Sequence, residues 1–395
     1  MKASFFVAWI TLLCSNLCAF AQLERTVILL SVDGFSASYL ADPLLKTIWK
    51  LKERASYAQS LKPVFPTLTF PNHLTLATGC YPGRHGIVAN RFLDKTRGEF
   101  TRSDDTDWLE CEPIWVSAER QKIKTAVAQW PLSYKKWNGM EASYHDEAFE
   151  KLSDQKVLEQ LLFWLGLSGQ KRPRLLMAYL TGVDGVGHDF GPESIEVKAR
   201  TRRFDSTLKW FLEKLEALKD IGSYTVVIVS DHGMAKVEKS VSITEFFSKA
   251  KIGGVPIISG PLLFIYLWDP FNRSHVASLF SGFDHVHAFP TDQTPQEWGP
   301  IHSRMGDVIV IADPPTIFLW NKREASETQK GAHGYDSKEG SMGGIFMAWG
   351  SGIKRQKKLN QVLTIDVAAT LANLLKINPP KDNQGNPIEE ILTED

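Results

Sequence analysis

The 395-residue sequence predicts an α/β fold in which helices flank a mainly parallel central sheet. Three observations support this prediction. Several short runs are almost wholly apolar, which is typical of strands buried in a parallel sheet. Segments with apolar residues at helical spacing separate these runs. Three of the runs are closely followed by an aspartate, at the end of the strand where parallel sheets bind ligands.

Each strand expected in the central sheet is an apolar run of five to seven residues, too short for a typical helix. In chain order these runs are residues 26–32, 124–128, 175–180, 224–229 and 344–349. The first run ends at Asp33 and Gly34, and the fourth ends at Ser230 and Asp231. Polar or turn-forming residues therefore mark where these strands stop.

The helices expected between and after these strands have apolar side chains that recur every three or four positions. In chain order they are residues 44–55, 152–167, 197–218 and 363–375. Strands that alternate with helices indicate parallel pairing, because a parallel connection needs a crossover segment.

Residues 241–330 have a less regular pattern, interrupted by proline and glycine. Two strand-like runs remain within them, at residues 262–267 and 308–311. We interpret this segment as a smaller, substrate-side elaboration of one domain that spans residues 22–395.

The N-terminus has the features of a secretory signal peptide, predicted at residues 1–21. Lys2 precedes a short apolar core, and Ala19-Phe20-Ala21 forms a small-residue cleavage site before Gln22. The apolar stretch is short for a membrane span, and no later stretch is long and apolar enough. We expect an exported protein, periplasmic or secreted, without a stable membrane span. The alternative is an uncleaved N-terminal anchor.

Two of the four cysteines, Cys80 and Cys111, would remain in the mature chain. They are too few for a disulfide framework and form no zinc-finger pattern, and whether they pair stays open. The chain has 45 basic and 45 acidic residues and zero formal net charge. Nothing in this balance argues for nucleic-acid wrapping. The expected partner is a small molecule. The sequence leaves the oligomeric state open.

Polar side chains gather after three of the expected strands, and these are Asp33, Asp184 with His188, and Asp231 with His232. Because the carboxyl ends of parallel strands meet at one edge, these side chains are expected to converge there. His333, on a loop bounded by glycines, is a further candidate. Mixed carboxylate and imidazole ligands suit Zn²⁺ best, with Mn²⁺ as a possible substitute.

Thr69 lies in residues 65–73, Phe-Pro-Thr-Leu-Thr-Phe-Pro-Asn-His, just before a run that favours a helix. One interpretation makes Thr69 a helix cap, with Pro71 in the first turn. Another interpretation uses the hydroxyl chemically, since a helix start is also an anion site. A pair of cations about 4 Å apart suits in-line displacement at phosphorus. We therefore predict that Thr69 is a nucleophile that carries a covalent phosphoryl group.

Six motifs in order resemble those of the nucleotide pyrophosphatase/phosphodiesterase family of the alkaline phosphatase superfamily. They are Asp33, Thr69-Phe70-Pro71-Asn72-His73, Gly79-Cys80-Tyr81-Pro82 with His85-Gly86-Ile87-Val88-Ala89-Asn90, Asp184-x-x-Gly187-His188-x-x-Gly191-Pro192, Ser230-Asp231-His232-Gly233-Met234, and His333-Gly334-Tyr335. The likeness runs from about residue 25 to residue 368. It implies an alkaline-phosphatase-like fold and a single phosphodiesterase catalytic domain. The family often has a basic residue at the position of Leu68. This difference leaves open which substrate the chain prefers.

The resemblance also implies a site with two zinc ions per chain. One ion would be held by Asp184, His188 and His333. The other would be held by Asp33, Thr69, Asp231 and His232, with Thr69 as the nucleophile.

Three further residues match substrate-binding positions of the family. Asn90 matches an asparagine that contacts a non-bridging phosphate oxygen. Phe70 and Tyr179 match aromatic residues that stack on a nucleobase, and hydrophobic packing is the alternative for both.

The expected function is that of an exported two-zinc hydrolase. It would cleave nucleotide pyrophosphate or phosphodiester bonds through a phosphothreonine intermediate and release nucleoside 5′-monophosphate. One alternative keeps this chemistry on a lipid phosphodiester with a choline or glycerol headgroup. The other is a non-catalytic binding protein on the same scaffold.

Overall fold

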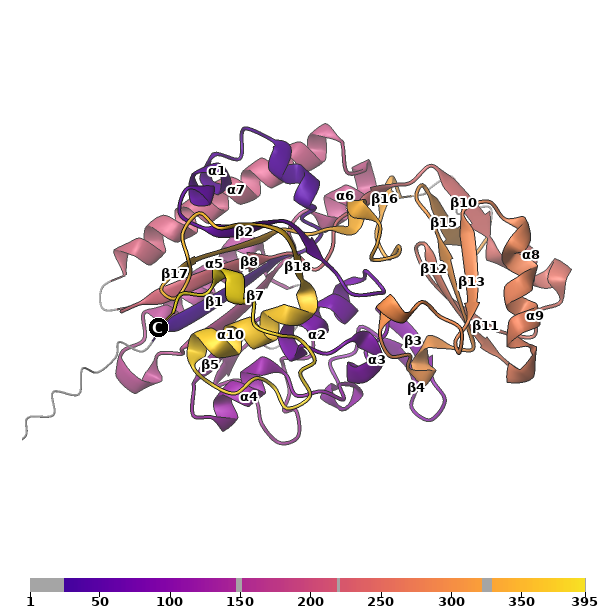
Figure 1. Ribbon diagram of the computed structural model, residues 1–395, viewed down its shortest axis with the longest axis horizontal. Helices are drawn as coiled ribbons and strands as arrows, with labels where there is room; N and C mark the ends of the chain where they lie inside the picture. The colour runs from indigo at the N-terminus through magenta and orange to yellow at the C-terminus, as the bar shows by residue number, and fades with distance from the viewer. Residues whose placement is uncertain (1–24, 147–150, 219–220, 322–328, 395) are drawn as a thin grey trace, which may run out of the picture.

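The computed structural model describes residues 25–146, 151–218, 221–321 and 329–394. The signal peptide predicted at residues 1–21 lies outside the described residues. A large sheet with its helices occupies one side of the view in Figure 1, and a smaller sheet occupies the other. The segments that carry the predicted site lie between the two.

The central sheet has eight strands in the order β18-β2-β17-β8-β1-β7-β5-β6. Their bounds are β1 Thr26–Val32, β2 Ser56–Lys62, β5 Thr125–Ala128, β6 Tyr144–His145, β7 Leu175–Leu180, β8 Tyr224–Val229, β17 Phe346–Gly350 and β18 Lys358–Leu363. β17 is antiparallel to both β2 and β8, and the other neighbouring strands are parallel. The predicted mainly parallel sheet is confirmed.

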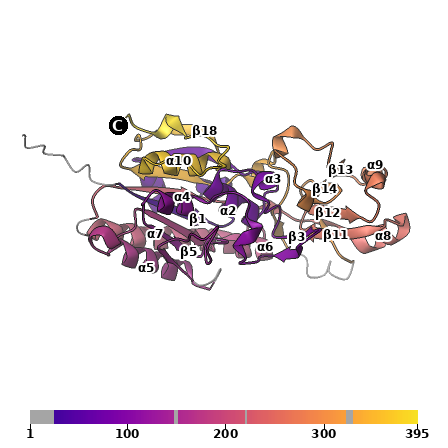
Figure 2. The ribbon, with the colours of Figure 1, turned by 90° about the horizontal axis from the view of Figure 1, so that it is seen from below.

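Helices cover both faces of this sheet. On β1, Ile28 and Leu30 face one hydrophobic core, and Val27 and Leu29 face another, because successive side chains of a strand point to opposite faces. The helices that contribute to the first core are α1 Lys46–Lys52, α5 Asp154–Leu165 and α7 Ile195–Ala217. Those of the second core are α2 Thr69–Thr78, α4 Ile114–Arg120 and α10 Val367–Leu375. Figure 2 shows α10 and α5 on opposite sides of the strands.

The sequence pattern predicts most of these elements, but it does not predict where each one begins and ends. The helix expected at residues 44–55 is shorter, because the chain leaves the helix after Lys52 and turns before β2 begins at Ser56. The closing helix expected at residues 363–375 starts with a 3₁₀ turn and continues as α10. β2 and β18 were not predicted. Both lie toward one edge of the sheet and carry several exposed or half-exposed polar side chains, so neither forms an apolar run.

The smaller sheet falls within residues 241–330 and has the order β11-β12-β14-β13, with all pairs antiparallel. Its strands are β11 Gly254–Ser259, β12 Leu262–Leu267, β13 Val286–Pro290 and β14 Val308–Ala312. Helices α8 (Ile243–Ala250) and α9 (Arg273–Ser278) pack beside it, as Figure 1 shows. Leu262 and Phe264 of β12 share a core with Leu68 and Phe70. The smaller sheet therefore packs directly on the stretch that contains Thr69.

Short elements connect these parts. They are α3 Pro82–His85, α6 Asp184–Phe190, β3 Arg91–Asp94 paired with β4 Gly98–Thr101, β9 Ala235–Lys236 paired with β16 Gly331–Ala332, and β10 Lys239–Ser242 paired with β15 Thr316–Leu319. The 3₁₀ turns are η1 Ala37–Ala41, η2 Thr106–Trp108, η3 Gly169–Lys171, η4 Pro270–Asn272, η5 Leu279–Gly282, η6 Gln296–Trp298, η7 Ser303–Met305, η9 Gly340–Met342, η10 Thr364–Asp366 and η11 Glu389–Ile391.

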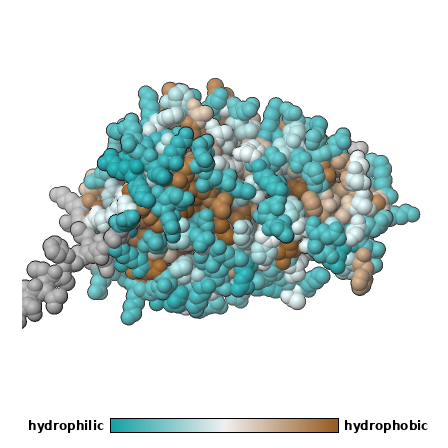
Figure 3. Space-filling model, in the orientation of Figure 1, coloured by the Kyte–Doolittle hydropathy of each residue, from teal (hydrophilic) through white to brown (hydrophobic). Residues whose placement is uncertain are grey.

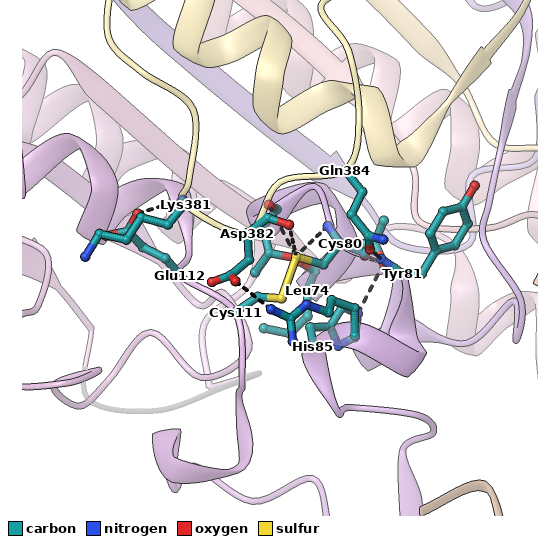
Figure 4. The surroundings of a disulfide bond; sticks show 12 residues. Leu74, Cys80, Tyr81, His85, Cys111, Glu112, Lys381, Asp382 and Gln384 are labelled. Carbon is teal, nitrogen blue, oxygen red and sulfur yellow. Dashed lines mark hydrogen bonds and ion pairs between the residues drawn. A yellow bond between two sulfur atoms is a disulfide. The ribbon is translucent and has the colours of Figure 1, made fainter. Parts of the chain in front are cut away.

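Cys80 and Cys111, whose pairing the sequence leaves open, form a disulfide bond just beyond the C-terminal end of α2. Figure 4 shows this bond beside the C-terminal segment that carries Asp382 and Gln384. The backbone N–H of Gln384 donates to the carbonyl of Gly79, so this segment is fastened next to the disulfide.

The surface seen in Figure 3 is mostly hydrophilic, and its hydrophobic side chains form small separate areas. In the described ranges, no helix combines the length and the apolar composition needed to cross a lipid bilayer.

Candidate active site

Three neighbouring strands bring the predicted aspartates together. β1 pairs with both β7 and β8, and all three run in the same direction. Asp33 directly follows β1, Asp231 follows β8 after one residue, and Asp184 begins α6 after β7. The convergence expected from the sequence is therefore what the described chain shows.

Two groups of possible metal ligands form at this edge, and His232 belongs to both. Asp184, His232 and His333 offer ligand atoms within 4.8 Å of one another, and so do Asp33, Asp231 and His232. His232 Nε2 lies 3.0 Å from Asp231 Oδ2 and 3.4 Å from Asp33 Oδ1.

His188 joins the first group through Asp184. Asp184 Oδ1 lies 3.4 Å from His188 Nε2 and 3.5 Å from His333 Nε2. The side chains of Asp184 and His188 are 20% and 19% exposed, whereas those of Asp231 and His232 are fully buried. The site is thus open on the side of α6 and closed around His232.

The carboxylate oxygens that face these imidazoles have no hydrogen-bond partner among the described residues. They are Asp33 Oδ1, Asp184 Oδ1 and Asp231 Oδ2. A buried carboxylate oxygen left unpaired is costly, and bound cations are a common remedy. The residues present therefore fit a site for metal ions.

The three histidines are oriented for the same purpose. Nδ1 of His188 lies 2.9 Å from the carbonyl oxygen of Gly331, and Nδ1 of His232 lies 2.9 Å from that of Gly233. Nδ1 of His333 lies 3.0 Å from the carbonyl oxygen of Thr67. A proton on Nδ1 satisfies each carbonyl and leaves Nε2 free to bind a metal, as is usual for metal-ligating histidines.

The charges of the site also call for a cation. Burial raises the pKa of Asp33 well above its ordinary value, and the nearby carboxylates of Asp231 and Asp184 raise it further. Burial lowers the pKa of His333 to about 3, and the neighbouring His232 contributes to this shift. His333 is therefore a neutral imidazole at ordinary pH, which is the form that binds metals.

Thr69 is the first residue of α2, and it is not the cap. The cap position is Leu68, whose own side chain makes no capping hydrogen bond. The expectation that the hydroxyl of Thr69 caps free N–H groups is wrong, because the residue already lies inside the helix. Its Oγ1 lies instead 3.4 Å from Nε2 of His232, which belongs to both groups of candidate metal ligands.

Asn90 lies beside the same helix start. Its Oδ1 accepts a hydrogen bond of 2.9 Å from the N–H of Phe70, the residue after Thr69. Asn90 therefore contacts the start of α2 through its amide oxygen.

The two aromatic residues expected to stack on a nucleobase are both 1% exposed. Phe70 packs edge-on against Phe100. Tyr179 lies edge-on to His73 and donates a 2.5 Å hydrogen bond to Asp33 Oδ2. The structure thus places Tyr179 behind Asp33, a candidate metal ligand, and both rings pack inside the protein.

Sequence reasoning did not find the residues that hold these groups in place. Thr67 donates from Oγ1 to the carbonyl of Tyr335 over 2.8 Å and accepts from the N–H of Gly334 over 3.0 Å, which fastens the loop of His333 to the start of α2. Asn72 accepts from the N–H of Val64 and donates to three carbonyls before the helix. Thr67 and Asn72 both belong to the motif around Thr69. Their local sequence pattern does not indicate that Thr67 bonds to residues far along the chain, or that Asn72 bonds to the backbone of the loop before the helix.

A family model described as type I phosphodiesterase/nucleotide pyrophosphatase matches residues 27–336. The chain belongs to this family. An uncharacterized pyrophosphatase/phosphodiesterase of Schizosaccharomyces pombe is 31% identical over 385 residues, which cover 92% of this chain and 79% of the relative. Human ectonucleotide pyrophosphatase/phosphodiesterase family member 1 is 28% identical, with 90% of this chain and 40% of the relative covered. This phosphodiesterase-family chain thus spans less than half of that human relative.

Solved phosphodiesterase structures share its fold. An inactive threonine-to-alanine variant of murine ectonucleotide pyrophosphatase/phosphodiesterase 5, in complex with AMP, matches with a TM-score of 0.86. The identity is 23%, and the match covers 94% of this chain and 100% of the other. This likeness supports the α/β, alkaline-phosphatase-like architecture.

Proposed function

We propose that the chain is an exported two-zinc hydrolase that cleaves nucleotide pyrophosphate or phosphodiester bonds and releases nucleoside 5′-monophosphate. One observation carries the proposal. Three buried carboxylate oxygens without hydrogen-bond partners among the described residues face imidazole nitrogens beside the hydroxyl of Thr69. Hydrolysis at phosphorus is the chemistry that such a set of ligands and a hydroxyl can support.

Two ions would share these ligands. One would be held by Asp184, His188 and His333, and the other by Asp33, Thr69, Asp231 and His232. The mixture of oxygen and nitrogen ligands suits Zn²⁺, with Mn²⁺ as a possible substitute. When bound, the ions would lower the pKa of the attacking hydroxyl and neutralise the leaving oxygen.

Thr69 would then act as the nucleophile. Its Oγ1 forms a bond to phosphorus and loses its proton to water, while the bond from phosphorus to the leaving oxygen breaks. The leaving group takes up a proton. Water then attacks the phosphothreonine, the bond from phosphorus to Oγ1 breaks, Oγ1 takes up the proton that the water loses, and the nucleoside 5′-monophosphate leaves.

The start of α2 would stabilise the phosphoryl group during both steps. Asn90 would donate from its NH₂ group to a non-bridging oxygen. The positive end of the helix dipole would act in the same direction.

The comparisons favour nucleotides over choline- or glycerol-bearing lipid headgroups. Relatives carry the name nucleotide pyrophosphatase, and the murine structural neighbour binds AMP. That neighbour is inactive as a threonine-to-alanine variant, which supports a threonine in the reaction. Hydrolase relatives and the intact ligand set argue against a non-catalytic binding protein.

Three observations support export. The sequence of residues 1–21 has signal-peptide character. Cys80 and Cys111 form a disulfide, and such bonds persist in oxidising compartments. Relatives at 28–30% identity include venom phosphodiesterases.

The function is tested with the purified protein, a substrate panel and a chelator. We expect rapid hydrolysis of the nitrophenyl ester of thymidine 5′-monophosphate, slower hydrolysis of nitrophenylphosphorylcholine, loss of both with chelator, and about two zinc ions per chain. Faster cleavage of the choline ester would favour the lipid alternative. Absence of zinc and of turnover, without rescue by added zinc, would favour the binding protein.

The variant Thr69→Ala tests the nucleophile. We expect hydrolysis to fall by at least about 1000-fold, because the covalent step is lost. Zinc content and thermal unfolding should stay near wild type, and Thr69→Ser should retain part of the activity. Turnover of Thr69→Ala within a few-fold of wild type would contradict the assignment.

A further inference from the structure

Arg304 is a buried arginine that ties the smaller sheet region to the loop of Asn90. It lies in η7 and its side chain is 6% exposed. Nε donates to Asp94 Oδ2 over 2.7 Å, and Nη1 donates over 3.0 Å to the carbonyls of both Gly86 and Trp108. Nη2 lies 3.0 Å from Glu110 Oε1. All four partners belong to residues 86–110, the segment that contains Asn90.

The contacts of Arg304 lie on both sides of Asn90 in the sequence. Gly86 is four residues before Asn90, and Asp94 is four residues after it. A guanidinium is planar and presents its donors in a rigid fork, so one side chain fixes both ends of the intervening loop. The backbone carbonyl of Asn90 is also held, because it accepts from the N–H of Arg102 over 3.1 Å.

Tyr266 of β12 makes a second connection between the same two regions. Its hydroxyl donates to the carbonyl of Arg304 over 2.5 Å and accepts from the N–H of Leu93 over 3.0 Å. Tyr266 is buried, at 8% exposure. The strand that follows Asn90 is therefore held by two side chains. One is Tyr266 of the smaller sheet, through its hydroxyl, and the other is Arg304.

Two glycines let the two regions approach this closely. A Cβ on Gly86, whose φ is +80°, would lie 2.4 Å from Arg304 Nη1. A Cβ on Gly83 would lie 1.6 Å from the carbonyl oxygen of Pro300. Both distances are shorter than any tolerated contact, so the segment around Arg304 docks on α3 only because side chains are missing there.

Asn90 connects the loop that Arg304 holds to the active site. Its Oδ1 accepts from the N–H of Phe70, which directly follows Thr69. We propose that Arg304 is a positioning residue for Asn90, and that η7 and β12 thereby complete the phosphate-binding side of the site. The proposal rests on the proposed function, because that function assigns the phosphate contact to Asn90.

A double-mutant cycle tests this role with the nitrophenyl ester of thymidine 5′-monophosphate. Loss of one donor to a transition-state oxyanion typically costs about 100- to 1000-fold in kcat, so a misplaced donor should cost less. We expect Arg304→Lys to lower kcat about 10-fold or more with KM changed less than about 3-fold. In the Asn90→Ala background, Arg304→Lys should change kcat by less than about 2-fold, because the positioned group is gone. Equal losses in both backgrounds would overturn the proposal.

Arg120→Lys is the matched control. Arg120 also forms a fork to a buried carboxylate, with Nε and Nη2 each 2.9 Å from an oxygen of Glu112. It lies in α4, on the central sheet. Because the side chain of Arg120 is 34% exposed, we expect a smaller drop in melting temperature and an unchanged kcat, whereas an equal loss of kcat would assign the effect of Arg304→Lys to general destabilisation.

Tyr266→Phe replaces Arg304→Lys in this test if Arg304→Lys does not fold, since Tyr266→Phe removes one hydroxyl and no charge. We expect it to lower kcat in the same direction by about 2- to 5-fold, again only when Asn90 is present. A loss of the same size in the Asn90→Ala background would overturn the proposal.

Hydrogen exchange separates this inference from the proposed function. The N–H of Phe70 and the amides of residues 86–94 should exchange faster in Arg304→Lys than in wild type or Arg120→Lys. Unchanged exchange there would overturn the positioning role, whether or not the protein hydrolyses the ester. An inactive wild type with faster exchange in the variant would reject the proposed function and keep the positioning role.

Discussion

Removal of the Tyr179 hydroxyl should weaken metal binding without removing any metal ligand. That hydroxyl donates to Asp33 Oδ2 over 2.5 Å, which leaves Asp33 Oδ1 as the oxygen without a partner among the described residues. In the Tyr179→Phe variant, Asp33 Oδ2 would lose this donor, while Oδ1 would still have no hydrogen-bond partner among the described residues. Burial already raises the pKa of Asp33, and the Tyr179 hydrogen bond opposes that rise. Without it, a proton should compete more strongly with the metal.

The size of the effect follows from the charge on Asp33. A hydrogen bond to a charged group contributes about 1.5 to 3 kcal/mol, which corresponds to roughly 10- to 150-fold in an equilibrium constant. Loss of an outer partner of a metal ligand typically costs about 10- to 100-fold in metal affinity. We therefore expect the zinc affinity of the Asp33 group to fall by about 10- to 100-fold at neutral pH.

Zinc titration of the metal-free protein against a chromogenic chelator measures this affinity. Tyr335→Phe is the matched control, because the buried hydroxyl of Tyr335 has no hydrogen-bond partner in the described part of the chain. It should leave zinc affinity unchanged. If Tyr179 instead stacked on a nucleobase, the phenylalanine ring would preserve that contact. Zinc affinities of Tyr179→Phe within about 2-fold of wild type would therefore refute the reasoning.

Two further predictions concern stability. Burial lowers the pKa of His85 to about 3, and its Nδ1 accepts from the N–H of Ile87, so the folded protein holds this imidazole neutral. The unfolded chain binds a proton near pH 6.5, so His85 costs stability as pH falls below that value, by about 1.4 kcal/mol per pH unit and about 2 kcal/mol by pH 5. In urea unfolding, stability should fall more steeply between pH 7 and pH 5 in wild type than in His85→Asn, with a difference of about 2 kcal/mol at pH 5; parallel slopes would contradict it. Replacing Cys80 and Cys111 by alanine opens a loop with a sequence separation of 31 and should cost about 3 to 4 kcal/mol in the free energy of unfolding. A loss below about 1 kcal/mol would show that the disulfide constrains little.

Much of the central sheet follows from local pattern. β1, β7 and β8 coincide with apolar runs because they are covered by helices on both faces, which favours apolar side chains at nearly every position. β2 and β18 escape prediction because their exposed polar residues interrupt that pattern. The direction of β17 also lies beyond the sequence, since an apolar run looks the same in a parallel and an antiparallel pair.

By itself, the sequence determined the chemical groups of the site and the edge of the sheet where they meet. Asp33, Asp184 and Asp231 follow adjacent parallel strands, and any chain that folds into those strands must bring them together. The sequence supplies the order of strands and polar residues along the chain, and the structure supplies the pairing of β1 with both β7 and β8.

Only the tertiary structure decided how those groups are oriented. Thr67 reaches Gly334, a separation of 267 residues, and Arg304 reaches Gly86, a separation of 218. Tyr179 proved to be a partner of Asp33 because its ring faces inward at the end of β7. Such contacts depend on the path of the whole chain, whereas periodicity and composition report only on neighbours in sequence.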